Sequence, residues 1–289
     1  MRSLRPRIAH EFYLSHKSNM SYSPDDLRRL RTETILREVE PHLEIGSTND
    51  RALVLCNETN LPVPYLILAE RQTAGRGRGA NRWWSSDGAL MFSVVIDAKD
   101  YTLPESRWPQ ISLTVGVAVC ETLAVLANST NLTTGRTPHS VGLKWPNDVW
   151  LNDRKVCGIL MEVPPTRCGR LVIGVGLNVN NSFATAPAEL SLIATSLGDE
   201  TGKTFDRAQV LTLLLQQLDE DLKRLAGSDE SLVENWQSRC VLKGRTVSID
   251  SGQRVVSGLC LGIADDGALR LQTPNGEQRF YGGVIRSIE

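Results

Sequence analysis

The residues best suited to chemistry lie in one segment rich in glycine and arginine, QTAGRGRGANRW at positions 72–83. Two of its three arginines, Arg76 and Arg78, alternate with three glycines, Gly75, Gly77 and Gly79. Glycine lets backbone N–H groups approach an anion closely, and guanidinium groups donate paired hydrogen bonds to phosphate or carboxylate oxygens. The pattern therefore predicts a site for a phosphate-bearing ligand.

Two common nucleotide-binding patterns are excluded for this segment. A dinucleotide site needs a helix directly after the glycines, whereas residues 83–88 (WWSSDG) are typical of a turn. No G-x-x-x-x-G-K-[ST] sequence occurs anywhere in the chain, so a P-loop is also excluded. Taken alone, the segment is as compatible with a flexible basic loop as with a ligand site.

A second candidate is Lys144, the first residue of the sequence KWPND at the end of an apolar strand. A lysine in that place would project from a rigid sheet into any cavity beside it, where its charge could stabilise negative charge on a phosphate. The alternative is an ordinary strand-edge lysine before a Pro-Asn-Asp turn that Asp148 caps.

Three further patterns place glycines or small polar residues at strand ends. Gly158 interrupts a strand at 155–162, and a glycine there indicates a bulge or close approach by a ligand. Gly174 and Gly176 precede Asn178 at another strand end, and residues 47–49 (STN) follow a short strand. Each pattern is weak evidence by itself.

The elements that position these residues follow from hydrophobic periodicity. Expected helices occupy about 24–39, 108–127, 206–226 and 230–239. Expected strands occupy 42–45, 65–70, 89–97, 141–145, 149–151, 156–163 and 171–179, with residues 73–86 forming a long loop. Strands that follow one another closely and few crossover helices indicate an α+β fold, with a mixed, mainly antiparallel sheet backed by helices.

The chain is predicted to contain three parts. Residues 1–22 are basic and without pattern, and we expect a disordered extension, with Met20 as a possible alternative start. Residues 23–240 form the main domain. From 241 to 289 the pattern changes to short alternating strands separated by turns, as in a small C-terminal β-barrel.

Composition excludes several classes of protein. The 289 residues carry 32 basic and 33 acidic side chains, so no overall field draws the chain to nucleic acid or to an anionic membrane. We expect no membrane-spanning run and no secretion signal, which makes the cytoplasm the expected location. The six cysteines form no C-x-x-C pair and are expected to be reduced core thiols, with no zinc site and no disulfide framework.

The patterns gain weight from their order: STN, QTAGRGR, KWPND, RKxxGIL and GxGxNxN follow one another from residue 47 to residue 180. In this order they resemble the biotin protein ligases, from about residue 40 to the C-terminus. Residues 282–284 (GGV) resemble that family's closing segment. The resemblance implies the class II synthetase-like biotin/lipoate ligase catalytic fold followed by a small SH3-like β-barrel.

The resemblance also implies roles for individual residues. Ser47, Thr48 and Asn49 match positions that border the biotin ureido ring, and Gln72 matches another biotin contact. The loop that closes over biotin and the adenylate phosphate corresponds to Arg76, Gly77 and Arg78. Lys144 matches the lysine that meets the reacting carboxylate and the α-phosphate. The remaining implied binding residues are Gly75, Trp83, Gly158 and Asn178. Residues 79–81 (GAN) depart from the family, in which many members have a further basic residue and a glycine.

The implied activity is ATP-dependent. Biotin and ATP form biotinyl-5'-AMP with Mg²⁺, and the biotinyl group is then transferred to a lysine of a biotin carboxyl carrier protein. The catalytic residues implied are Lys144, Arg76 and Arg78. The Mg²⁺ ligands, the carrier's identity and a homodimer are left open, as is the general base, for which Asp148 and the adenylate phosphate are candidates.

Two alternative functions remain. A lipoate ligase shares the fold, but its usual R-R-x-S-G-G-G loop is absent. A biotin-sensing repressor would need a DNA-binding domain, and the 46 residues before Ser47 leave little room for one. We therefore expect no DNA binding.

Overall fold

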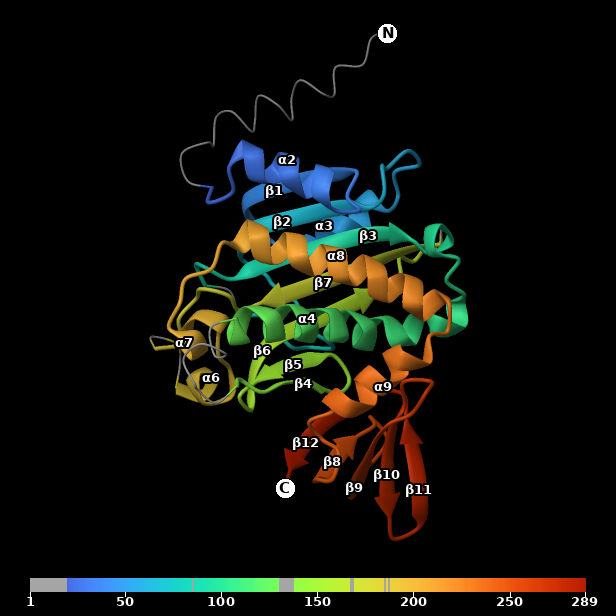
Figure 1. Cartoon of the computed structure of the whole chain (residues 1–289). Coiled ribbons are helices and arrows are strands. Elements are labelled where there is room, and N and C mark those ends of the chain that lie inside the picture. The colour runs from blue at the N-terminus through green and yellow to red at the C-terminus, as the bar shows by residue number, and fades with distance from the viewer. Residues whose placement is uncertain (1–19, 85, 130–137, 167–168, 185, 187) are drawn as a thin grey trace.

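The computed structural model describes residues 20–84, 86–129, 138–166, 169–184, 186 and 188–289. Its main body is a seven-stranded sheet in the order β1-β2-β3-β7-β6-β5-β4 (Figure 1). β1 runs parallel to β2, and the other neighbouring pairs are antiparallel. The strands are β1 (Glu38–Ile45), β2 (Tyr65–Gln72), β3 (Leu90–Asp97), β4 (Val141–Lys144), β5 (Asp148–Leu151), β6 (Arg154–Glu162) and β7 (Arg170–Leu177). The expected mixed, mainly antiparallel sheet is confirmed.

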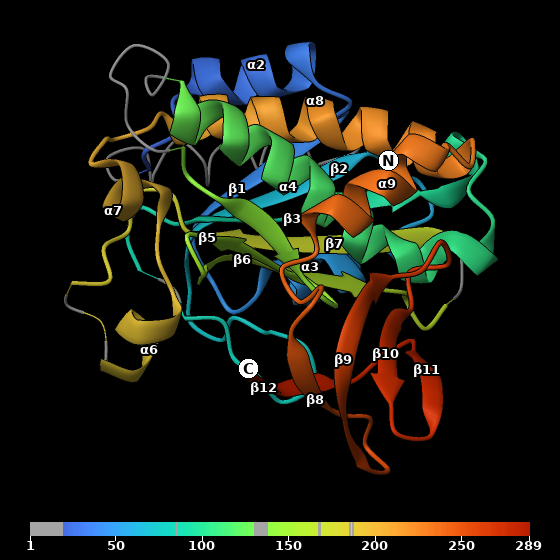
Figure 2. The same ribbon diagram turned by 60° about the horizontal axis from the view of Figure 1, so that its bottom comes forward.

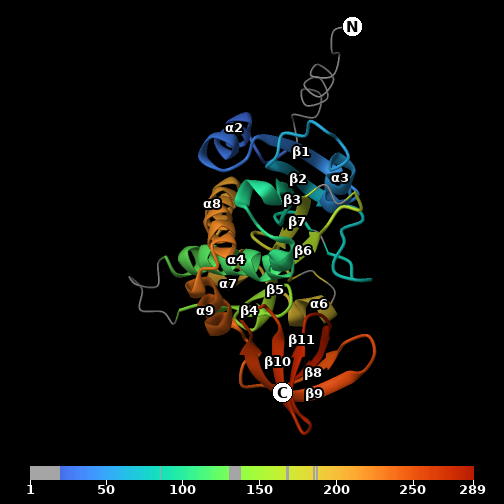
Figure 3. The ribbon, with the colours of Figure 1, turned by 90° about the vertical axis from the view of Figure 1, so that its right-hand side faces the viewer.

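Helices cover the two faces of this sheet unequally. Helices α2, α4 and α8 lie over one face, and the short helix α3 lies on the other (Figure 3). The helices are α2 (Pro24–Glu33), α3 (Thr48–Leu55), α4 (Ile111–Asn128), α6 (Ala188–Ile193), α7 (Leu197–Thr201), α8 (Arg207–Ala226) and α9 (Glu230–Arg239), with 3-10 turns η1 (Ala98–Tyr101) and η2 (Glu105–Gln110). The α3 face is therefore the more open one.

The apolar helix α4 is the centre of the core. Together with η2 it spans Glu105–Asn128, and its most apolar 18-residue window has a mean hydropathy of 1.7, so it is long and apolar enough by composition to cross a membrane. The expectation that no apolar run approaches that length was therefore wrong. In the fold 72% of its most apolar window is buried, and a Cβ on Gly116 would lie 2.6 Å from Leu143 of β4. The helix packs directly against the sheet as its main core helix.

Two boundaries near the N-terminus differ from the sequence prediction. Helix α2 ends at Glu33 instead of continuing to 39, because β1 already begins at Glu38. Pro41 lies inside this strand, and an edge strand tolerates proline because one side of it needs no N–H donor. The polar segment after β1 is also a helix, α3, which Ser47 caps by accepting a hydrogen bond from the Asp50 N–H.

The C-terminal part forms a separate five-stranded sheet in the order β11-β10-β9-β8-β12, as expected of a small β domain (Figure 2). Its strands are β8 (Thr246–Asp250), β9 (Val255–Ile263), β10 (Leu269–Thr273), β11 (Gly276–Phe280) and β12 (Val284–Ile288). The Trp145 indole donates to the Gly267 carbonyl at 3.0 Å, and the Val241 N–H donates to Leu143 O at 2.9 Å. These bonds join the C-terminal sheet and the segment leading to it to the region around β4.

The cysteines behave as the sequence predicted, as far as the structure describes them. Cys56, Cys120, Cys157, Cys240 and Cys260 are free and buried. Cys168 lies outside the described residues.

The first described residues are firmly attached to the main domain. Tyr22 is only 4% exposed, and the Ser21 N–H donates to Glu70 at 2.8 Å. Arg207 of α8 pairs with Glu70 at 2.6 Å and lies 4.9 Å from the Tyr22 ring centroid. The ordered chain thus begins before Ser23, while the expected disorder of residues 1–19 lies outside the described residues.

We predict that a chain beginning at Met20 is as stable and as active as the full chain, because every contact of Ser21 and Tyr22 is kept. A chain beginning at Asp25 should lose about 3 kcal/mol or more of unfolding free energy, since the Tyr22 ring and the Ser23 cap are removed. Urea denaturation of the three chains measures this. A loss of stability already at Met20 would show that residues 1–19 contribute to the fold.

A second prediction concerns Asp221 of α8, whose side chain is fully buried. Burial raises the pKa of Asp221 to about 6, although the Arg224 guanidinium, 2.6 Å away, opposes the shift. Because the folded pKa lies above the unfolded one, this group stabilises the fold fully below about pH 4, and that stability is lost as the pH rises through about 6.

The loss corresponds to about 3 kcal/mol. Asp221→Asn should therefore gain about that much stability relative to the wild type between pH 4 and pH 7. Urea denaturation of both proteins across this range tests it. A constant difference between them would contradict the shifted titration.

Candidate active site

A cavity of about 760 Å³ opens on the α3 side of the main sheet and is bordered by the C-terminal sheet. Its size is in the range of small-molecule sites. The predicted site residues that line it are Ser47, Thr48, Asn49, Gln72, Arg76, Gly77, Arg78, Trp83, Lys144, Gly158 and Asn178. Gly75 does not line it; this glycine packs against Trp83, whose carbonyl oxygen would lie 3.0 Å from a Cβ at position 75.

The floor of the cavity is a row of paired residues that crosses four strands. Lys144 pairs with Asp148, Asp148 with Gly158, and Gly158 with Gly176. Partners in register lie on one face of a sheet, so the sequence patterns KWPND, RKxxGIL and GxGxNxN meet at this row.

The glycines of the floor make room for two side chains. A Cβ on Gly176 would lie 2.4 Å from the Trp83 ring, and one on Gly158 would lie 3.0 Å from it. In the neighbouring row, a Cβ on Gly174 would lie 2.0 Å from the Asn49 amide oxygen. Trp83 and Asn49 therefore lie directly on the sheet, where no larger residue than glycine fits beneath them.

A network of buried hydrogen bonds fixes the wall at the start of α3. The Thr48 N–H donates to the Gln72 amide oxygen at 2.8 Å. Ser93 of β3, fully buried, donates to the Asn49 oxygen at 2.5 Å and also lies 2.8 Å from the Thr48 hydroxyl. The Asn49 amide donates to the Leu160 carbonyl at 3.1 Å. This wall is neutral and offers both donors and acceptors, and Ser93 is a member that the sequence patterns did not indicate.

We predict that Gly174→Ala weakens binding of biotin, the ligand that the sequence resemblance implies, at least about tenfold, because the methyl group must displace Asn49 from its bonds to Ser93 and Leu160. Gly46→Ala is a matched control, since nothing lies within 4 Å of a Cβ at that position. Calorimetric titration with biotin measures both variants. Equal biotin affinities of the two variants would mean that the position of Asn49 does not affect ligand binding.

The Gly-Arg segment is more regular than the sequence suggested. Arg76 and Arg82 form an antiparallel bridge, and the Gly77 N–H donates to Asn81 O at 2.8 Å. At its end, Arg78 donates to the Gly283 carbonyl of the C-terminal domain at 2.7 Å. We call residues 75–83 the Gly-Arg hairpin; it lies between the main sheet and the C-terminal domain.

Arg76 and Arg78 of this hairpin have different surroundings. Arg76 forms ion pairs with Asp50 at 2.8 Å and with Glu162 at 2.6 Å, so its guanidinium is bound to carboxylates of the protein. The described contact of Arg78 is to a carbonyl oxygen, which neutralises no charge. Arg78 is therefore better able than Arg76 to bind an added anion.

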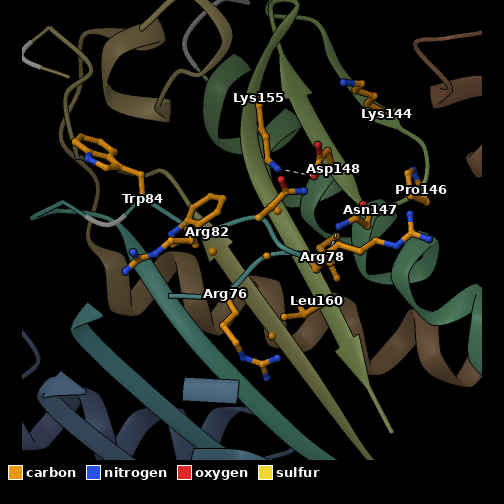
Figure 4. Close-up of a pocket in the computed structure, with 18 of the residues that line it drawn as sticks. Arg76, Arg78, Arg82, Trp84, Lys144, Pro146, Asn147, Asp148, Lys155 and Leu160 are labelled. Atoms are coloured by element: carbon orange, nitrogen blue, oxygen red, sulfur yellow. Dashed lines mark hydrogen bonds and ion pairs between the residues drawn. The ribbon is translucent and has the colours of Figure 1, made fainter. Parts of the chain in front are cut away.

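Two lysines reach the cavity from β6 and β4, the strands on either side of β5. Lys155 forms an ion pair with Asp148 at 2.7 Å across the strands (Figure 4), and its Nζ lies 5.8 Å from the Trp83 ring centroid. Lys144 lies over the Trp150 ring at 4.9 Å. Burial lowers the pKa of Lys144, against the opposing effect of Asp148. Lys155 was not predicted as a site residue from the sequence, although it belongs to the RKxxGIL pattern three residues before Gly158.

Asn178 faces the cavity but is engaged by the protein at both ends of its amide. It donates to the Thr195 carbonyl at 3.0 Å and accepts from Asn181 at 3.1 Å. Its geometry is that of a residue that holds the 178–197 segment in place at the cavity edge. Among the described residues, no group of three or more His, Cys, Asp or Glu side chains is arranged to hold a metal.

Comparisons with known proteins agree on one kind of relative. Residues 44–179 match the Biotin/lipoate A/B protein ligase family, and residues 243–285 match the Biotin protein ligase C terminal domain. The chain is 32% identical to Biotin--[acetyl-CoA-carboxylase] ligase of Mycobacterium tuberculosis, over 86% of this chain and 90% of the relative. It is 31% identical to Bifunctional ligase/repressor BirA of Bacillus subtilis, over 89% and 76%.

The fold gives the same result. The structure of biotin protein ligase from Aquifex aeolicus in complex with biotin and ATP superimposes with a TM-score of 0.70 and 30% identity, covering 88% of this chain and 99% of that one.

Proposed function

The chain belongs to the biotin protein ligase family, and on that premise we propose how its residues attach biotin to a carrier protein. The reaction has two steps. The biotin carboxylate attacks the α-phosphorus of ATP and pyrophosphate leaves, which gives biotinyl-5'-AMP. A carrier lysine amine then attacks the acyl carbon, the bond to the phosphate oxygen breaks, and AMP leaves while the amine loses a proton.

The observation that supports these roles is the division of the cavity into a neutral and a cationic part. The wall around Thr48, Asn49 and Gln72 offers hydrogen-bond partners without charge, as a ureido ring requires. Across the floor row, Lys155 and Lys144 supply positive charge, as a carboxylate and phosphates require. Biotin has the same polarity, with the ureido ring at one end and the carboxylate at the other.

We assign Lys155 to the reacting carboxylate and α-phosphate, because it extends into the middle of the floor beside Trp83. Lys144 supports the same charge from β4, on the other side of β5. Arg78 is assigned to the adenylate phosphate, with the hairpin covering it. Phosphoryl transfer needs mainly positioning and charge neutralisation, so these side chains suffice without a protein nucleophile.

Mg²⁺ is expected to arrive with ATP. The carboxylates that line the cavity, among the described residues, are Asp148 and Asp250. Mg²⁺ is commonly held by one or two carboxylates together with substrate phosphates, so this donor set fits it, with Asp148 nearest the floor. The ion would supply further neutralisation of the phosphate charge.

The acceptor is a biotin carboxyl carrier protein, and we propose the carrier domain of a biotin-dependent carboxylase. A cytoplasmic location, the absence of DNA binding and the choice between monomer and homodimer stay predictions from the sequence. The lipoate alternative is not favoured, because the usual R-R-x-S-G-G-G loop of lipoate ligases is absent from the sequence.

The test is exchange of labelled pyrophosphate into ATP, run in parallel with biotin and with lipoate. We expect exchange with biotin only, followed by labelling of a carrier domain on one lysine. Exchange that depends on lipoate and not on biotin would overturn the assignment.

A further inference from the structure

We propose that Glu162 is a positioning residue that holds the Gly-Arg hairpin against the neutral wall of the cavity through its ion pair with Arg76. This inference rests on the proposed function for its consequences in binding, but its structural part can be tested without any ligand. It reverses the role that the sequence resemblance implies for Arg76, which would be a direct contact to the reacting groups.

The contacts of Glu162 join three segments that are far apart in the sequence. Its Oε1 accepts a hydrogen bond from Arg76 Nη1 at 3.1 Å. Its Oε2 accepts from Arg76 Nη2 at 2.6 Å and from the Asn49 amide at 2.9 Å. The Arg76 Nε lies 2.8 Å from Asp50. The end of β6, the first turn of α3 and the hairpin thus meet at one side chain.

The partner on the wall is rigid. Asn49 is 4% exposed, lies on Gly174, and is bonded to Ser93 and to the Leu160 carbonyl. Its two amide hydrogens are directed at Leu160 O and Glu162. Glu162 therefore connects a fixed part of the biotin wall to the hairpin, and a change in its position moves the hairpin relative to that wall.

The charges indicate what Arg76 contributes. Two carboxylates, Asp50 and Glu162, face the Arg76 guanidinium. Its Nε contacts Asp50, and its Nη1 and Nη2 contact Glu162. If Arg76 is removed, both carboxylates lose their partner beside a cavity that has to accept an anion, and they repel it. The loss on removing Arg76 then comes largely from Glu162, and it should be smaller when Glu162 is neutral.

The first test uses trypsin on the full chain without ligand. Glu162→Gln should accelerate cleavage within residues 76–82, because the hairpin is released from its carboxylate. Glu44→Gln is the matched control: Glu44 is 54% exposed, lies outside the cavity and is 3.8 Å from Arg71. Equal cleavage rates in the two variants would overturn the proposal whether or not the protein ligates biotin.

The second test is a double-mutant cycle on the same chain. Arg76→Gln and Glu162→Gln should each raise the KM for biotin and the rate of biotinyl-5'-AMP release by about tenfold, with little change in kcat. The double variant should resemble either single variant, and Glu162→Asp should recover part of the loss. If the effects of the two changes multiply, Arg76 acts by a direct contact to the ligand, and the proposed positioning role of Glu162 is wrong.

Discussion

Replacing Lys155 by alanine is expected to reduce biotin adenylation by about 10²–10³-fold, the usual cost of removing one group that stabilises charge in a transition state. Its ammonium group extends over the floor row to Asp148 at 2.7 Å and lies near the Trp83 ring. The substitution also leaves the Asp148 carboxylate without this partner beside the incoming phosphates, which adds repulsion to the loss of attraction.

Lys144→Ala is the matched comparison from β4, which β5 separates from the strand of Lys155. This lysine packs over the Trp150 ring, so part of its role is contact with the protein, and we expect a smaller loss of about tenfold. Pyrophosphate exchange at saturating biotin and ATP measures both variants, with melting temperatures as the check on folding. If Lys144→Ala has the larger effect, Lys144 meets the reacting groups, as the resemblance implies, and the assignment of Lys155 is wrong.

The difference between these lysines shows where prediction from sequence ends. Both belong to patterns visible in the sequence, but their relative position depends on strand register. The Lys144–Asp148–Gly158–Gly176 row is set by two turns and by a register shift between Val149 and Trp150. One residue of slip would turn every one of these side chains to the other face, and no local pattern fixes that.

Elements with strong local signals were predicted well. Helix α8 begins after the Asp206 cap and ends at Gly227, both visible in the sequence. The meander β4–β6 was predicted from its turns. Helix α3 was missed because its first turn, Thr48 to Arg51, is polar and its length is only eight residues, so helical periodicity has little to act on.

Long-range pairing was the least accessible part of the site. Glu162 lies 86 residues from Arg76 in the chain, and its carboxylate gives no signal beyond an ordinary strand-end glutamate. The sequence therefore presented Arg76 and Arg78 as equivalent, two guanidinium groups awaiting an anion. The fold distinguishes them, because Arg76 is held by two carboxylates, whereas the contact of Arg78 among the described residues is to a carbonyl.

This distinction leads to the second large effect, at Arg78. We expect Arg78→Gly to release biotinyl-5'-AMP before transfer. The adenylate carries one phosphate charge, and a guanidinium on the covering hairpin holds it by a charged hydrogen bond of about 1.5–3 kcal/mol. Losing that bond corresponds to roughly 10- to 100-fold faster escape. Removing Arg78 also removes the bond from the hairpin to Gly283, so the cover over the cavity is loosened at the same time.

Released adenylate is a reactive mixed anhydride, and it should acylate lysines of unrelated proteins. The measurement is the dissociation rate of biotinyl-5'-AMP together with biotin incorporated into a lysine-rich bystander protein. Arg254→Gly is the matched control, since Arg254 is an exposed arginine just before β9 that contacts Gln278 and does not line the cavity. Faster release with bystander labelling in Arg78→Gly alone is the expected result. If both variants behave like the wild type, the hairpin does not retain the intermediate, and the adenylate must be held by the floor and wall of the cavity.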